Sequence, residues 1–145
     1  MPVYEGTHSE LVSATPEKTF ATMTDFERLP DWQGPLERCQ VLTRNSDGLA
    51  EDVEYEIDAK VRRVTYRLRH SYRPPHEIGS EYLGGDFDCF EGRWTFAAAG
   101  EGSTEARFDL RIDPGLPIPG RLQRLLNDRV LKSAVRDLRR RLEEG

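Results

Sequence analysis

The chain has 145 residues, the size of one ordinary domain, and this length can bury one sizeable hydrophobic core. Charged residues make up 32% and hydrophobic residues 37%, without a biased tract, which excludes a disordered or fibrous protein. Lys and Arg total 21 against 26 Asp and Glu, and the resulting net charge of −5 argues against nucleic acid as a partner.

Targeting signals and cysteines indicate the compartment. The sequence contains no run of eighteen apolar residues, and its first ten residues lack the basic and apolar regions of a signal peptide. We therefore expect a cytoplasmic protein without stable membrane insertion. Cys39 and Cys89 lie 50 positions apart, which gives neither a CxxC pair nor a disulfide framework. Two buried, reduced thiols are the expected state.

The N-terminal third predicts one strand and two short helices. Residues 3–12 predict a strand, although their apolar positions alternate poorly. Thr15 and Pro16 then mark a helix start, because Thr is a good N-cap and Pro suits the first helical position, where its missing N–H would have no partner. This helix is expected to end near Asp25. Residues 26–32 predict a second short helix, broken by Pro30.

The middle of the chain predicts a series of strands joined by turns. Segments with strand-like patterns, most of them alternating with period two, are residues 36–43, 53–59, 64–72, 76–83, 87–97 and 104–112. Asp47-Gly48 predicts a tight hairpin between the first two segments, since Asp-Gly suits the positive backbone angles of such turns. In residues 87–97, Phe87 and Cys89 are out of phase with Trp94. Either they face the other side of the sheet or a bulge shifts the register.

Charged residues alternate on two neighbouring segments. Glu54 and Asp58 lie on one, and Arg63, Arg67 and Arg69 lie on the next. We interpret these residues as a solvated face with ion pairs between strands, and not as a functional site.

A long helix is predicted at the end of the chain, where apolar residues recur at intervals of three and four from Leu122 to Leu142. At 1.5 Å per residue it is roughly 35 Å long, which is enough to cross a whole sheet. Antiparallel strands with one solvent-exposed face and one apolar face, the latter covered by a long helix, define an α+β arrangement.

Several of these segments resemble one family. Residues 13–20 (SATPEKTF) and 25–32 (DFERLPDW) resemble the opening of START-like (SRPBCC) proteins, the polyketide cyclase/dehydrase and lipid transport superfamily. Residues 90–96 (FEGRWTF) and the last helix are similar to the late hairpin and gripping helix of that family. The resemblance covers nearly the whole chain. It implies a single START-like domain over residues 1–145 with the helix-grip (START/Bet v 1-like) fold, in which a curved antiparallel sheet of six to seven strands wraps a long C-terminal helix and two short helices follow the first strand.

The resemblance also implies an apolar cavity between the sheet and the last helix. The side chains expected to line it are Tyr55, Tyr66, Leu68, His70, Tyr72, Trp94, Phe96, Phe108 and Leu110 on the sheet, opposed by Leu126, Val130 and Ala134 on the helix. Aromatic walls with a few polar groups are typical of small-molecule pockets. From periodicity alone, however, the same residues could fill a solid core.

His70 is the residue of greatest chemical interest, because it shares the inner face with Tyr66 and Tyr72. It could orient a ligand oxygen or exchange a proton, or it could be a core histidine satisfied by those tyrosines. No metal site and no cofactor are predicted, because the histidines and cysteines lack ligand spacings. No nucleophile is predicted either, because no GxSxG motif occurs.

Three functions remain open. The first is binding or transport of a hydrophobic small molecule, such as a lipid, quinone or polyketide-like compound. The second is a polyketide aromatase/cyclase, an enzyme that the resemblance associates with an interior arginine; only Arg62 shares the inner face here. The third is a protein-interaction or stress-related module that uses residues 116–119 or the helix. The sequence pattern favours a protein that is not an enzyme. It leaves the oligomeric state open, with a homodimer as one option.

Overall fold

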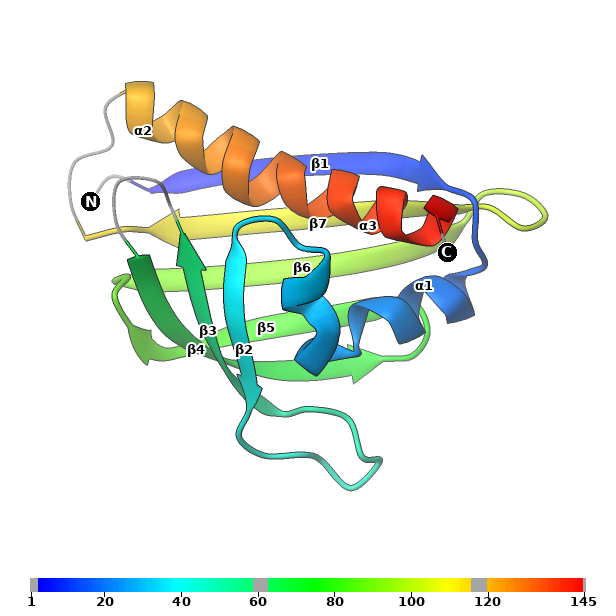
Figure 1. The fold of residues 1–145 in the computed structure, drawn as a ribbon, viewed down its shortest axis with the longest axis horizontal. Coiled ribbons are helices and arrows are strands. Elements are labelled where there is room, and N and C mark those ends of the chain that lie inside the picture. Colours follow the sequence, from blue (N-terminus) through cyan, green and yellow to red (C-terminus); the bar gives the residue numbers. More distant parts are fainter. Residues whose placement is uncertain (1–2, 59–62, 116–119, 145) are drawn as a thin grey trace.

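The computed structural model describes residues 3–58, 63–115 and 120–144. Within these residues, antiparallel strands form one seven-stranded sheet in the order β1-β7-β6-β5-β4-β3-β2, and a long C-terminal helix lies along one side of it (Figure 1). This arrangement confirms the predicted α+β fold class. The strands are β1 (Tyr4–Val12), β2 (Leu36–Val41), β3 (Asp52–Asp58), β4 (Arg63–Arg73), β5 (Glu77–Gly85), β6 (Cys89–Ala98) and β7 (Thr104–Asp113).

Two short helices follow β1, as predicted. Helix α1 (Pro16–Met23) begins at the expected N-cap, where the Thr15 hydroxyl accepts the Lys18 amide at 3.2 Å. The 3₁₀ helix η1 (Phe26–Asp31) contains Pro30. Phe26 and Leu29 of η1 are buried and bring this segment into the core.

The C-terminal helix is continuous from Gly120 to Glu144 but changes geometry along its length. It consists of α2 (Gly120–Leu125), a π-helical segment η2 (Leu126–Lys132) and α3 (Ser133–Glu144). In π-helical geometry residues five apart share a face, and accordingly Leu126 and Leu131 are both buried. The predicted spacing of three and four places Val130 in the centre of the stripe, whereas the structure leaves Val130 half-buried.

Strand β1 alternates between buried and exposed positions more regularly than its sequence indicates. Its inner face carries polar residues because β1 is an edge strand that runs under α3. Glu10 of this face contacts Arg139 of α3 at 3.2 Å and the His8 ring at 2.8 Å. These polar partners replace apolar contacts, and they account for the weak hydrophobic pattern of residues 3–12.

The β2–β3 connection is longer than the predicted tight hairpin. A turn forms at the expected residues, with Gly48 at φ +83° and its amide bonded to the Asn45 carbonyl at 3.0 Å. However, β2 already ends at Val41, and the turn lies at the tip of a loop that a single bridge between Arg44 and Ala50 narrows.

Strands β5 and β6 pair over only part of their length. Their register runs from Glu77↔Thr95 to Ser80↔Gly92, whereas β5 continues beside β4 as far as Gly85. Phe87 precedes β6 and turns inward, because its ring lies 5.3 Å from Tyr66 and 5.7 Å from Phe90. Phe87 therefore belongs to the inner side and lies outside the regular strand. Cys89 lies within β6, in the phase opposite to the buried Phe90, and the β6–β7 register runs past it without a bulge.

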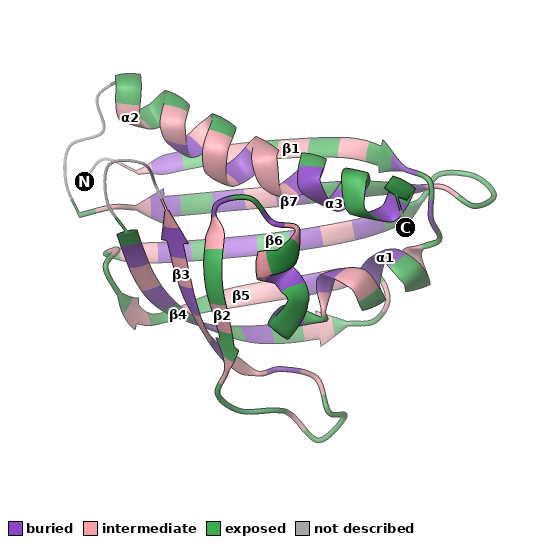
Figure 2. Ribbon diagram, viewed as in Figure 1, coloured by how far each residue is buried: buried purple, intermediate pink, exposed green. Residues whose placement is uncertain are grey.

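The sheet has the expected wet outer face, and Figure 2 shows buried and exposed positions alternating along β6 and β7. The predicted ion pairs form, with Arg67 bonded to Glu54 at 2.8 Å and Arg69 bonded to Asp52 at 2.8 Å. The two cysteines are free, as predicted, but half-buried. Cys39 lies on the edge strand β2 and Cys89 at the start of β6, where the core does not enclose them fully.

Candidate functional site

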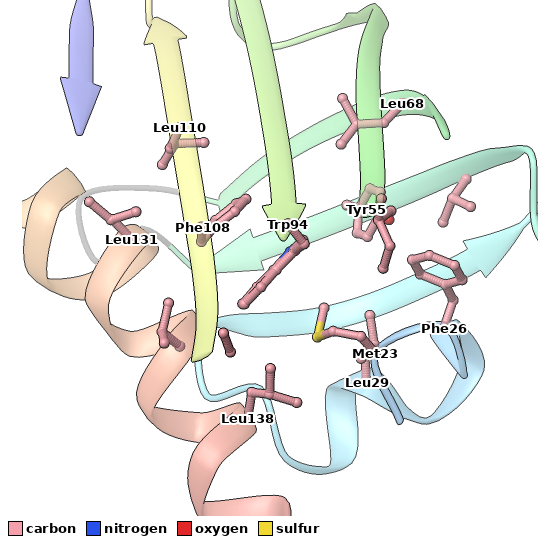
Figure 3. Packing of buried hydrophobic residues seen from close by; sticks show 14 of the residues in the cluster. Met23, Phe26, Leu29, Tyr55, Leu68, Trp94, Phe108, Leu110, Leu131 and Leu138 are labelled. Carbon is pink, nitrogen blue, oxygen red and sulfur yellow. The ribbon is translucent and has the colours of Figure 1, made fainter. Parts of the chain in front are cut away.

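A cavity of about 110 Å³, partly open to solvent, lies among the sheet, η1 and the C-terminal helix. Figure 3 shows Tyr55, Trp94 and Phe108 pointing from the strands toward the space that Met23 and Leu29 border from the other side. Among the described residues, none that lines the cavity carries a carboxylate, ammonium or guanidinium group. The lining residues are Met23, Phe26, Leu29, Gln33, Pro35, Leu36, Tyr55, Ile57, Tyr66, Leu68, His70, Ile78, Ser80, Phe90, Trp94, Phe108, Val130 and Ala134.

Stacked aromatic rings form much of the wall. Tyr66 is stacked between Tyr55, at 5.2 Å between ring centroids, and Phe90, at 4.8 Å. Gly85 of β5 makes room beside Tyr66, because a Cβ at this position would lie 2.5 Å from the Tyr66 Cα atom. The missing side chain lets rings from β3, β4 and β6 stack together. Stacked pairs of this kind contribute favourably to the packing of the wall.

His70 is part of a buried hydrogen-bonded chain. Its Nε2 atom lies 2.5 Å from the Tyr55 hydroxyl, and its Nδ1 atom lies 2.9 Å from the Ser80 hydroxyl. The Phe26 ring stacks on the imidazole, with 4.8 Å between ring centroids. Because a neutral imidazole has one donor and one acceptor nitrogen, these two hydroxyls satisfy both of its hydrogen-bonding positions.

Burial controls the ionisation of these groups. Desolvation lowers the pKa of His70 from 6.5 to about 4, although a backbone hydrogen bond with Gly79 opposes this shift. Burial also raises the pKa of the Tyr55 and Tyr66 hydroxyls well above their usual range. His70, Tyr55 and Tyr66 are therefore all neutral at pH 7, and none has a pKa near neutrality, where general acid–base catalysis is most efficient.

The C-terminal helix is fastened to the other elements beside the cavity. The Gln33 side-chain amide donates to the Ala134 carbonyl at 3.1 Å, and the Gly34 amide donates to the Asp137 carboxylate at 2.8 Å. Arg129 of η2 donates to the Asp58 carbonyl at the end of β3, at 2.9 Å. These three bonds join η2 and α3 to the elements that border the cavity.

The structure brings most of the predicted site residues together around the cavity. Those that line it are Tyr55, Tyr66, Leu68, His70, Trp94, Phe108, Val130 and Ala134. Phe96, Leu110 and Leu126 are buried but do not line it, and the half-buried Tyr72 bonds the Ala50 carbonyl through its hydroxyl. Whether any of the twelve contacts a ligand stays a prediction.

Sequence reasoning missed the residues that α1, η1 and the following loop contribute. Met23, Phe26 and Leu29 could have been found from the helical spacing of apolar residues in this region. Gln33 gives no such signal, because its place beside the cavity depends on its bond to a residue 101 positions away.

The inner face of the described sheet carries no arginine. Arg63, Arg67 and Arg69 point outward into ion pairs, as predicted. Arg62 and residues 116–119, on which two of the functional options depend, lie outside the described residues. In the part of the chain that is described, no helix is long and apolar enough to cross a membrane.

A curved antiparallel sheet, a long helix along it and a cavity between them define a START-like helix-grip protein. Solved structures support this class. A START superfamily protein from Mycobacterium smegmatis matches with a TM-score of 0.88 and 24% identity over 97% of this chain and 98% of that one. A protein from Thermus thermophilus matches with a TM-score of 0.84 and 23% identity over 97% of each chain. The ZhuI aromatase/cyclase from a Streptomyces strain matches with a TM-score of 0.81 and 14% identity, over 99% of this chain and 95% of that one.

The family model for polyketide cyclase/dehydrase and lipid transport matches residues 12–139. The chain belongs to this family. No curated protein matches the sequence significantly.

Proposed function

We propose that the protein binds a hydrophobic small molecule in the cavity between the sheet and the C-terminal helix. The observation that carries this proposal is the composition of the wall, which is apolar and aromatic with no charged side chain among the described lining residues. Such a wall favours transfer of an apolar compound from water. A single domain over residues 1–145 and a cytoplasmic location remain predictions that are consistent with this role.

The size of the cavity limits what it holds in this conformation. Its volume of about 110 Å³ lies below the roughly 300–1,000 Å³ of pockets for drug-sized ligands, and it is closer to engineered cavities that hold one benzene ring. A single-ring compound therefore fits with little rearrangement. A lipid or polyketide requires the walls to move apart, and breaking the bonds that join η2 and α3 to the neighbouring elements would allow such a movement.

The binding test uses α-methylstyrene, an uncharged single-ring hydrocarbon, and isothermal titration calorimetry. Ala134→Phe places a ring at the half-buried helix position that lines the cavity. Ala21→Phe is the matched control, since Ala21 is an exposed helix residue away from the lining. We expect binding to wild type and to the control, and at least tenfold weaker binding to Ala134→Phe. Equal affinity for all three proteins would refute binding in this cavity.

Native mass spectrometry of the protein purified from its own host, beside a denatured sample, then identifies the chemical class of any natural ligand. A bound hydrophobic compound that is released on denaturation supports the proposal. A consistently ligand-free mass, together with no response to α-methylstyrene, favours a filled core and a protein-binding role instead.

A second candidate function is that of an aromatase/cyclase. Two observations favour it: the structural similarity to aromatase/cyclases, and the buried chain of Tyr55, His70 and Ser80. The neutral state of this chain and the absence of an inward arginine among the described residues oppose it. The test is incubation with a linear poly-β-ketone thioester, followed by chromatography. Formation of an aromatic product that His70→Gln abolishes would support this second function, whereas a product yield equal to that of the uncatalysed reaction would exclude it for this substrate.

A further inference from the structure

Two polar side chains in the cavity wall make no hydrogen bond within the described part of the protein. The Tyr66 hydroxyl and the Trp94 indole N–H have no hydrogen-bond partner anywhere in the described residues, although both side chains are only 6% exposed. No polar side-chain atom of the described residues is both fully enclosed and unpaired. The two groups therefore border open space, and the open space that both residues line is the cavity.

The other polar side chains of the wall each make at least one hydrogen bond, although the Gln33 side-chain oxygen has no bond within the described residues. Tyr55 and Ser80 bond the two nitrogens of His70, and the Gln33 amide donates to a backbone carbonyl. The unpaired pair consists of one hydroxyl, which donates and accepts, and one indole N–H, which only donates. An unused donor in a buried wall is costly unless something accepts from it, so a ligand that complements Tyr66 and Trp94 carries a hydrogen-bond acceptor.

The absence of charged side chains among the described lining residues also limits the class of ligand. The described lining residues supply no cation to pair a carboxylate or phosphate and no anion to pair an amine. An isolated ion loses its hydration on entry and gains no compensating partner. A neutral acceptor, by contrast, loses only the hydration of one polar group.

We propose that the cavity selects an uncharged ligand with a carbonyl-type hydrogen-bond acceptor, and that Tyr66 and Trp94 are the specificity-determining residues that donate to it. This inference rests on the proposed function, since it names the class of ligand that the same cavity binds. Tyr66 is held for this task by stacking between Tyr55 and Phe90, and Trp94 by stacking on Phe108 at 4.5 Å. Both donors are therefore fixed before the ligand arrives.

The test compares three single-ring compounds of similar shape by calorimetry at pH 7. Acetophenone carries the carbonyl, α-methylstyrene replaces its oxygen by a methylene group, and benzoate replaces the methyl ketone by an anion. In wild type we expect acetophenone to bind at least as tightly as the more hydrophobic α-methylstyrene, and benzoate not to bind.

Variants test whether the hydrogen bonds from Tyr66 and Trp94 account for the affinity for acetophenone. Tyr66→Phe removes one hydroxyl and should weaken acetophenone binding about threefold to tenfold, the loss of one net hydrogen bond, while α-methylstyrene binding changes less than about twofold. Trp94→Phe should lower the ratio of acetophenone to α-methylstyrene affinity in the same direction. Tyr72→Phe is the matched control, because the Tyr72 hydroxyl bonds the Ala50 carbonyl and does not border the cavity. Affinity for α-methylstyrene reports whether each variant still forms the cavity.

The outcomes separate this inference from the proposed function. If wild type binds α-methylstyrene but both donor variants bind acetophenone as wild type does, or if benzoate binds as well as acetophenone, the assignment of the ligand class is overturned and the binding function stands. If wild type binds none of the three compounds and the protein from its own host is ligand-free, the proposed function fails and this inference fails with it.

Discussion

The buried histidine makes a quantitative prediction about acid stability. In the folded protein the pKa of His70 lies at about 4, whereas an unfolded chain returns it to 6.5. Between these two values the unfolded state binds a proton that the folded state does not, so stability falls as the pH is lowered through this window. The contribution is fully present above pH 6.5 and is largely lost at pH 4.

The magnitude follows from the two pKa values. One pKa unit corresponds to about 1.4 kcal/mol, so the full difference is about 3–4 kcal/mol, of which about 2–3 kcal/mol is lost between pH 7 and pH 4.5. Since His70 is only 7% exposed, solvent screens this effect little.

The assay is urea denaturation at a series of pH values, followed by circular dichroism. His70→Gln removes the titrating group, so the variant should lose about 2–3 kcal/mol less than wild type between pH 7 and pH 4.5. Tyr72→Phe removes a hydroxyl whose pKa burial raises and which does not ionise in this pH range, so this control should retain the wild-type pH dependence. If the free energy of unfolding changes with pH equally in His70→Gln and in wild type, burial does not hold His70 neutral, and the reasoning is refuted.

Two further predictions concern the wall and its fastening. Gly84 and Gly85 both have φ +140°, but only at Gly85 would a Cβ clash, at 2.5 Å from the Thr65 carbonyl oxygen. Gly85→Ala should therefore cost at least about 2 kcal/mol more in unfolding free energy than Gly84→Ala, and equal losses in urea denaturation would contradict the clash. Arg129→Ala removes the bond between η2 and the end of β3, so N-phenyl-1-naphthylamine should associate and dissociate about fivefold faster in stopped-flow fluorescence, with Kd changed less than about twofold. Arg124→Ala, which alters an exposed arginine of α2, should leave both rates unchanged; a change in Kd alone for Arg129→Ala would show that the bond does not control entry.

Local patterns predicted the strands and helices because each leaves a signature within a few residues. The N-cap at Thr15 and the alternation in residues 104–112 depend only on neighbours along the chain, and both are confirmed. The inner face of β1 was harder to recognise, because Glu10 is stabilised by Arg139, a residue 129 positions away. The π-helical segment was not predicted either. It packs against β1, where Leu131 lies close to Gly6, and this contact between distant parts of the chain leaves no signal in the local sequence.

The candidate site was predictable where one strand face defines it. Tyr55, Tyr66 and His70 follow from period-two alternation, which assigns them to the inner side. Their division into satisfied and unsatisfied polar groups could not be read from the sequence. Tyr55 and Tyr66 have the same side chain and neighbouring positions, yet one hydroxyl bonds His70 and the other bonds nothing in the described residues.

The cavity has a mechanical consequence beyond binding. A cavity of about 110 Å³ per molecule corresponds to about 66 mL/mol when multiplied by Avogadro's number, and the decrease in volume on unfolding scales with the part of such a cavity that water does not fill. Hydrostatic pressure therefore favours states in which the space between the sheet and the C-terminal helix has collapsed or filled with water. A ligand that fills the cavity removes this volume difference. Pressure therefore favours loss of the empty cavity, whereas a bound ligand stabilises the folded protein in which the cavity is present.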